Sequence, residues 1–273
     1  MPAGACGWTQ SIQYNGDDQD NHFNALQVTV AKTISRGLSF TSNYAWQRAF
    51  DWASNFRTWD APAVKGRNDS LREQQIVSYG NWQIPVGRNR TYLSKSPGWV
   101  DEVVGGWEIS PIINWSSGLP FTLTYAGCGN NLPGDAPCYP NGRPSSLPTN
   151  VGSFNTTGHN RAFFNGFTDL YKNGPQGNFS APGLDQIGNA GRNTKFGPNF
   201  YTTDIAVQKN FTLHESLFAQ FRLDAYNAFN HINAGNPNGN ASTINVDQGP
   251  VFITSEPPGG KPRQLQFSVR LQF

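Results

Sequence analysis

The feature that most limits the fold of this chain is a strict two-residue alternation of apolar and polar side chains. It is clearest from 264 to 273, where the apolar positions are Leu265, Phe267, Val269, Leu271 and Phe273, and the polar ones are Gln264, Gln266, Ser268, Arg270 and Gln272. Successive side chains of a β-strand point to opposite faces of the sheet. This segment is therefore predicted to be a strand with one apolar and one polar face.

The same alternation recurs in segments of about ten residues, which is the length of a tilted membrane strand. The expected strands are 24–34, 38–47, 75–84, 107–115, 201–211 and 217–225, with an eighth at 8–14. A tight turn at 35–37 should join the first two into a hairpin. Pro111 interrupts the alternation of 107–115. We predict about seven or eight antiparallel strands in an all-β fold.

The connections between these strands alternate in length. Short links at 35–37 and 212–216 and a medium link at 85–106 alternate with long links at 51–73, 126–199 and 230–263. One end of the sheet would then carry compact turns and the other end long polar loops. This asymmetry is typical of an outer-membrane β-barrel with short periplasmic turns and long extracellular loops.

A soluble β-sandwich also has alternating strands, so composition is needed to separate the two readings. Charged residues make up 14% of the 273 residues, against about 25% in ordinary soluble proteins. The polar strand faces carry mainly Gln, Ser, Thr and Asn, whereas a soluble sheet protects its edges with charges. Aromatic residues are 13% of the chain and gather near strand ends, as in the interfacial girdles of membrane barrels. These observations favour the membrane barrel.

Several motifs, taken in order, resemble the C-terminal part of TonB-dependent outer-membrane receptors, and most closely the Oar-like group. They are Gly105-Gly106-Trp107, Ser117-Gly118-Leu119-Pro120-Phe121, Gly188-Asn189-Ala190-Gly191-Arg192-Asn193, 204–211, Phe221-Arg222, Asn227-Ala228-Phe229-Asn230-His231, and Pro262-Arg263-Gln264 leading to Phe273. The resemblance implies a barrel of about 22 strands around an N-terminal plug, with a TonB-contacting segment before it. Residues 1–273 would then be a single segment, the C-terminal third of the barrel, without signal, plug or TonB-contacting segment.

The function that this resemblance implies is energised uptake of an unidentified small solute across the bacterial outer membrane. The expected partners are outer-membrane lipid, the barrel-assembly machinery and, through the missing N-terminal part only, the TonB complex. One alternative is a complete eight-stranded structural or adhesion barrel. Another is a secreted, soluble β-rich carbohydrate-binding module.

The sequence offers little that indicates catalysis or nucleic-acid binding. Its four histidines, His22, His159, His214 and His231, lack the spacing of metal ligands, and no nucleophile or phosphate-binding motif occurs. We therefore expect no enzyme activity, no metal and no cofactor. Asp17, Asp18 and Asp20 could bind Ca²⁺, although a solvated loop is the favoured reading. The net charge of +2 without a basic block argues against a nucleic-acid partner.

Three groups of residues are candidates for specific roles. Cys128 and Cys138 bracket nine residues of the longest loop and could form a disulfide in an oxidising compartment. Asp204, Arg222, Asp224 and Arg270 should face the lumen, because an unpaired charge in hydrocarbon costs several kcal/mol; there they could contact solute or pair with one another. Leu265, Phe267, Val269 and Leu271 should face lipid, and the resemblance makes Phe273 part of the barrel-assembly signal.

Overall fold

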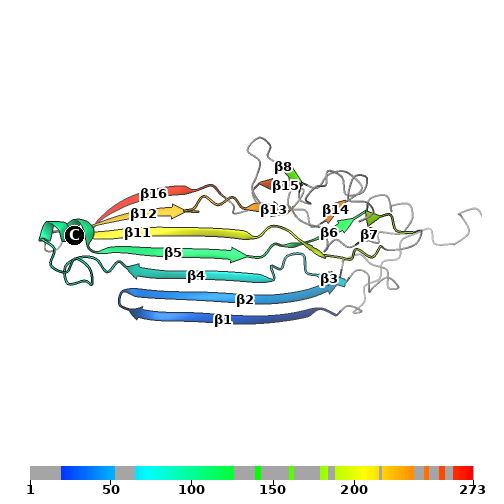
Figure 1. Cartoon of the computed structure of the whole chain (residues 1–273), viewed down its shortest axis with the longest axis horizontal. Coiled ribbons are helices and arrows are strands. Elements are labelled where there is room, and N and C mark those ends of the chain that lie inside the picture. Colours follow the sequence, from blue (N-terminus) through cyan, green and yellow to red (C-terminus); the bar gives the residue numbers. More distant parts are fainter. Residues whose placement is uncertain are drawn as a thin grey trace, which may run out of the picture.

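The computed structural model describes residues 20–52, 65–125, 139–142, 160–162, 179–183, 188–214, 217–236, 243–245, 252–255 and 261–272. Its main feature is one antiparallel sheet, drawn lengthwise in Figure 1. The long strands are β1 (His22–Ser35), β2 (Leu38–Trp52), β4 (Gln74–Gln83), β5 (Trp107–Ser116), β11 (Phe200–His214), β12 (Leu217–Tyr226) and β16 (Gln264–Gln272). The all-β prediction is confirmed, and each of the predicted strands 24–34, 38–47, 75–84, 107–115, 201–211, 217–225 and 264–273 corresponds to one of them.

The long strands lie in the order β1-β2-β4-β5-β11-β12-β16, so neighbours along the chain are neighbours in the sheet. An eighth, short strand, β3 (Lys65–Arg67), pairs with the end of β2. Within the described part of the chain, β1 and β16 each have one partner strand. The sheet is therefore open at both edges. The strand expected at 8–14 lies outside the described residues.

The turn between β1 and β2 is tight, as expected. Arg36 and Gly37 both have positive φ, 51° and 77°, between β1 and β2. A two-residue hairpin turn with positive φ at both positions matches the twist of its strands, and glycine takes that conformation without strain. The longer connection between β4 and β5 carries the helix α2 (Gly98–Val104), at the left end of the sheet in Figure 1.

The opposite end of the sheet carries the long connections, which contain short strands of their own. These are β6 (Pro120–Thr124), β7 (Asn141–Gly142), β8 (Asn160–Ala162), β9 (Phe179–Ser180), β10 (Lys195–Phe196), β13 (Ala234–Asn236), β14 (Thr243–Asn245) and β15 (Phe252–Ser255), arranged in three small sheets. They cluster at the right of Figure 1. The most deeply buried side chains, Phe121, Leu123 and Tyr139, also belong to this end. We call this region the loop cap.

Pro111 lies within β5, which is an inner strand with a neighbour on each side, and the strand continues past it. Its backbone faces Ile205 of β11, and the register between β4 and β5 is the same before and after it. On the β4 side, the pairing is interrupted only opposite Pro111 and Ser110. A proline has no N–H to donate and usually occurs at sheet edges, so a local gap in the ladder accommodates it here. In the described part of the chain, no helix is long and apolar enough to cross a membrane.

Candidate functional site

The register of the sheet separates the long strands into two continuous faces. Residues directly opposite each other on neighbouring strands share a face. One row across six strands is entirely apolar: Leu38, Trp82, Ile109, Val207, Leu223 and Phe267. The adjacent row on the other face is entirely polar: Gln83, Glu108, Gln208, Arg222 and Ser268. We call these surfaces the apolar face and the polar face.

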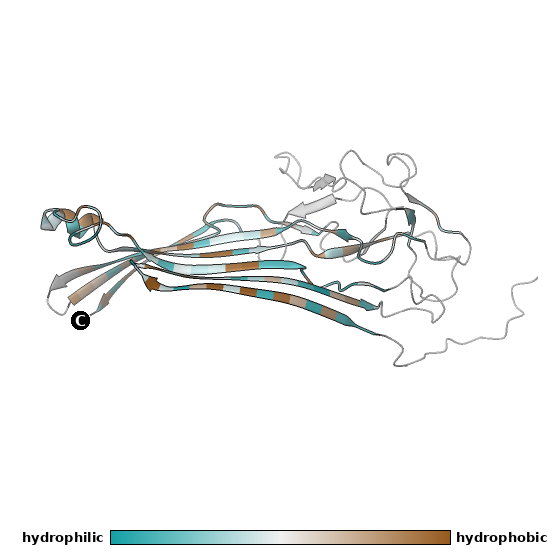
Figure 2. Cartoon of the chain, turned by 60° about the horizontal axis from the view of Figure 1, so that its bottom comes forward, coloured by the Kyte–Doolittle hydropathy of each residue, from teal (hydrophilic) through white to brown (hydrophobic). Residues whose placement is uncertain are grey.

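Within the described part of the chain, no second layer of protein covers most of the apolar face. Its large side chains are exposed, for example Leu26 at 54%, Phe267 at 65% and Val269 at 69%. Figure 2 shows hydrophobic and hydrophilic residues alternating along these strands. A soluble sheet must bury its apolar face against another element. A sheet left bare in this way is suited to a lipid environment, where hydrocarbon covers it.

The polar face carries a chain of hydrogen bonds that crosses four strands. Glu108 Oε1 of β5 accepts from Asn81 Nδ2 of β4 at 2.5 Å and from Gln208 Nε2 of β11 at 2.9 Å. Gln208 in turn accepts from Arg222 Nη1 of β12 at 3.5 Å. Arg222 also forms an ion pair with Asp224 at 2.8 Å. Each of these polar side chains has a polar partner. The network can therefore face a water-filled lumen and present donors and acceptors to a solute.

The four charged residues predicted for the lumen all lie on the polar face, but only two of them are brought together. Arg222 and Asp224 are two residues apart on β12, and they form the pair described above. Arg270 lies opposite Gln220 on the neighbouring strand. Asp204 accepts a hydrogen bond from the backbone N–H of Asn227 at 2.8 Å, so it holds the turn after β12. Sequence reasoning missed Glu108, which its position next to Ile109 in the alternation could have indicated.

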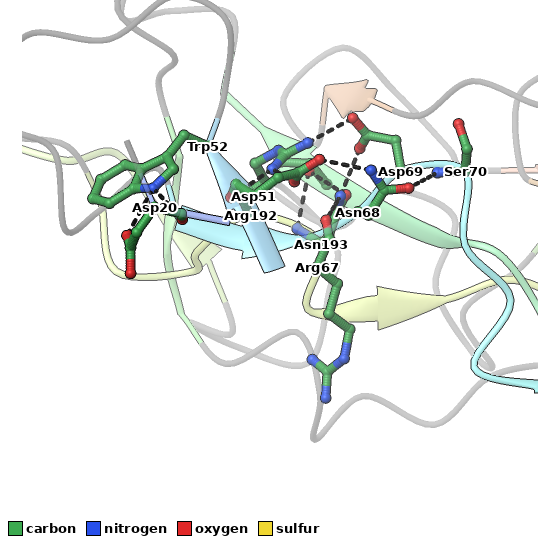
Figure 3. Close-up of polar contacts among 10 residues, drawn as sticks. Asp20, Asp51, Trp52, Arg67, Asn68, Asp69, Ser70, Arg192 and Asn193 are labelled. Atoms are coloured by element: carbon green, nitrogen blue, oxygen red, sulfur yellow. Dashed lines mark hydrogen bonds and ion pairs between the residues drawn. The ribbon is translucent and has the colours of Figure 1, made fainter. Parts of the chain in front are cut away.

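At the loop end of the sheet, Arg192 and Asn193 form a buried polar cluster with the ends of β2, β3 and β6 (Figure 3). Arg192 Nη1 pairs with Asp51 at the end of β2, and its Nη2 is 2.7 Å from Asp69 Oδ2. We call Arg192, Asn193 and their partners the latch. The Arg192 side chain is 8% exposed, whereas Asp51 and Asp69 are 25% and 44% exposed. Burial alone would lower the pKa of Arg192, but hydrogen bonds to Asp51 and Asp69 outweigh burial and raise the pKa above its ordinary value.

Asn193 connects β6 to the latch. Its amide donates to the carbonyl oxygen of Arg67 and to Asp69 Oδ1, both at 2.5 Å, and its side-chain oxygen accepts from Thr122 Oγ1 at 2.7 Å. Asn193 is fully buried and has a φ of 54°, a conformation that asparagine tolerates better than most residues. The loop cap is thus joined at Asn193 to a strand of the sheet that lies more than 100 residues earlier in the sequence.

Close backbone approach explains a glycine in this region. A Cβ at Gly66 would stand 2.6 Å from the carbonyl oxygen of Arg192, which no real side chain tolerates. Beside the latch, Tyr139 is 1% exposed. Its burial raises its pKa to about 12, because the phenolate would lose its hydration. The loop cap is therefore packed like a small protein core.

The remaining residues singled out from the sequence either lie outside these two polar networks or outside the described residues. Leu265, Phe267, Val269 and Leu271 are exposed on the apolar face of β16. Cys128, Cys138 and Phe273 lie outside the described residues, as do Asp17 and Asp18. Asp20 accepts hydrogen bonds from Lys65 and Trp52, and these contacts, with Lys65 as the larger cause, lower its pKa to about 2. Among the residues that the structure describes, no cluster of three His, Cys, Asp or Glu side chains could hold a metal.

These features define the class of the protein. A single antiparallel sheet with one bare apolar face, one polar face, tight turns at one end and long loops at the other is the wall of an outer-membrane β-barrel. Residues 3–266 match the family described as outer membrane beta barrel domain, and the chain belongs to that family. Its location is therefore the bacterial outer membrane. Comparison with curated proteins and with solved structures finds no match.

Proposed function

We propose that this chain forms the C-terminal wall of a TonB-dependent receptor barrel that takes up a solute by an energised mechanism and has no enzyme activity. The observation that carries the proposal is the open sheet. β1 and β16 stand at opposite edges, with five strands between them, and they are not paired with each other within the described residues. A larger barrel would supply a further strand to each edge.

The rival eight-stranded barrel would need its first and last strands to meet. Figure 1 shows β1 and β16 at opposite edges of the sheet, and within the described residues they do not pair with each other. An open sheet edge is not tolerated in hydrocarbon, because each unpaired backbone group there costs several kcal/mol. Closure by more strands is therefore the better account. The soluble carbohydrate-binding module has no support from the outer-membrane family to which the chain belongs.

The motifs that resemble TonB-dependent receptors occupy positions where the structure needs them. Gly105-Gly106-Trp107 leads into β5, and Gly106 has a φ of 72°. Arg192 and Asn193 form the latch that fastens the loop cap. Asn227 has a φ of 46° in the turn after β12, where its amide donates to the carbonyl oxygen of His231. The structural roles of these three motifs support the resemblance.

The test is to express residues 1–273 alone with an added signal peptide, beside the complete coding sequence read from the DNA upstream of Met1. We expect the upstream sequence to encode a signal, a plug and further strands in frame. Cells with the complete protein should accumulate one of a panel of siderophores, oligosaccharides and peptides in a manner that depends on the proton gradient. Residues 1–273 alone should aggregate, be degraded or form a barrel without uptake. Gradient-dependent accumulation by residues 1–273 alone would overturn the proposal.

A further inference from the structure

The connection between β4 and β5 is an ordered excursion at the tight-turn end of the sheet. Asp101 of α2 accepts a hydrogen bond from the backbone N–H of Arg88 at 2.5 Å, and Gly87 N donates to the carbonyl oxygen of Tyr92 at 2.9 Å. A Cβ at Gly87 would meet Gly105 Cα at 2.9 Å, so the two ends of the excursion touch. Residues 85–106 therefore form a defined element. We call it the turn-side excursion.

Two side chains of the apolar face hold the C-terminal end of this excursion. Trp107 lies in the apolar face, opposite Lys209 in the register, and its Nε1 donates to the carbonyl oxygen of Val103 at 2.9 Å. Lys209 donates from Nζ to the carbonyl oxygen of Gly105 at 2.6 Å. Since both donors project from the apolar face, the end of α2 lies at the rim of that face.

Lys209 is a charged residue on the apolar face, and aromatic rings enclose it. It lies between Trp107 on β5 and Phe221 on β12, whose ring centroids are 6.4 Å apart in an edge-to-face arrangement. Its ammonium group is 4.9 Å from the Phe211 ring centroid, and the residue is 3% exposed. A lysine at a membrane boundary extends its charged end toward the interface while its stem stays in apolar surroundings. Lys209 therefore fits a position near the edge of the hydrocarbon.

The outward surface of the excursion combines exposed apolar side chains with three cations and one exposed acid, Glu102. Trp99 and Val103 are four residues apart, on one side of α2, and are 74% and 62% exposed. The neighbouring turn exposes Tyr92 and Leu93, at 62% and 54%. Arg88, Arg90 and Lys95 are exposed in the same turn. Tryptophan and tyrosine favour the membrane interface, and lysine and arginine are attracted to anionic lipid headgroups.

We propose that the turn-side excursion is a lipid-binding element that lies in the periplasmic interface of the outer membrane. Trp99 and Val103 insert at the boundary between headgroups and acyl chains, and the neighbouring cations contact lipid phosphates. The occupant is phospholipid, because the excursion joins the apolar face beside Lys209 and continues that face. The element anchors the short-turn end of the barrel at a set depth, as an interfacial amphipathic helix does.

The experiment places a fluorescent NBD label at single cysteines in the complete protein, after Cys6, Cys128 and Cys138 have been changed to serine. The protein is reconstituted in vesicles of phosphatidylcholine and phosphatidylglycerol. Trp99→Cys and Val103→Cys carry the test. Asn210→Cys is the matched control, because Asn210 is adjacent to Lys209 at the same level but lies on the polar face, opposite Gln220.

Labels at 99 and 103 should emit at shorter wavelength than the label at 210. Spin-labelled lipids should quench them several-fold more strongly, and aqueous iodide several-fold less. If the labels at 99 and 103 are quenched by iodide as strongly as the control, the excursion faces water or a protein partner and the proposal is wrong. If the protein without these three cysteines does not assemble, the intrinsic tryptophan fluorescence can be used instead. Its quenching by brominated lipid is then compared between the native protein and Trp99→Phe. The fraction quenched must fall in Trp99→Phe.

Discussion

Arg192 and Asp69 are 123 residues apart in the sequence, yet Nη2 of Arg192 lies 2.7 Å from Oδ2 of Asp69. This contact, with the pairing of Arg192 to Asp51, fastens the loop cap to the outer end of the sheet. A buried cation held by two carboxylates is costly to disrupt, because removal of one partner leaves the others without compensation. The latch therefore holds this described part of the loop cap at the end of the sheet.

Replacement of Arg192 by methionine should loosen the loop cap and leave the sheet intact. Loss of one partner of a fully buried pair costs about 3 to 5 kcal/mol, but Asp51 and Asp69 can regain some hydration, so we expect about 1 to 3 kcal/mol. Limited proteolysis of the loops and thermal unfolding would measure the change. Lys65→Met, which removes a partly exposed pair with Asp20, is the control and should cost clearly less. Equal effects of the two variants would contradict the buried latch.

The two faces of β16 should respond very differently to arginine. Val269 lies on the apolar face, opposite Phe221, whereas Ser268 lies on the polar face, opposite Arg222. An arginine on the lipid face costs about 2 to 4 kcal/mol at the midplane and less toward the interface, and Val269 lies in the same cross-strand row as Lys209. Val269→Arg should therefore lower the free energy of unfolding by less than this midplane value, but by more than Ser268→Arg. Refolding titrations of both variants of the complete protein in lipid would measure this difference. Equal costs would refute the assignment of the apolar face to lipid.

Alkaline pH should release the loop cap through Tyr139. Its pKa in the folded state, about 12, lies above the ordinary value of 10.0. The folded state then holds the proton more tightly, so this contribution to stability is complete below pH 10 and is lost as the pH rises toward 12. The difference in tyrosinate absorbance between the native protein and Tyr139→Phe measures the titration of this one group. A midpoint near pH 10 would show that Tyr139 is accessible to water.

Cys128 and Cys138 should be joined in protein taken from the outer membrane. Their short separation and the oxidising environment outside the cytoplasm favour a disulfide that closes a loop. Mass spectrometry of a digest prepared without reductant should show the linked peptide. Two thiols that alkylate freely in the same material would rule the bond out.

Deletion of Phe273 from the complete protein should sharply lower its level in the outer membrane. The expectation rests on the resemblance to receptors whose terminal aromatic residue is read by the barrel-assembly machinery. Immunoblots of separated membranes would measure the level, with Phe273→Tyr as the matched control that keeps an aromatic terminus. A normal level of the deletion variant would show that assembly does not read this residue.

The alternation of residues determined where the strands lie and which side chains share a face. This information is local, because side chains two residues apart in a strand point the same way. It predicted all seven long strands and the face of Arg222 and Val269. It also predicted the tight turn at Arg36 and Gly37, since so short a link between paired strands leaves few backbone conformations.

Tertiary structure decided the relationships between residues distant in the chain. The pairing of β5 with β11 spans the longest loop, and no periodicity within either strand encodes that choice. Only the packed loop cap brings Arg192 to Asp51 and Asp69, so the latch was not predicted. Likewise, the two-residue alternation places Lys209 on the apolar face. The aromatic rings around its side chain, however, include Trp107 and Phe221 from two other strands. Local sequence specifies the direction of a side chain, whereas its neighbours depend on which distant segments pair beside it.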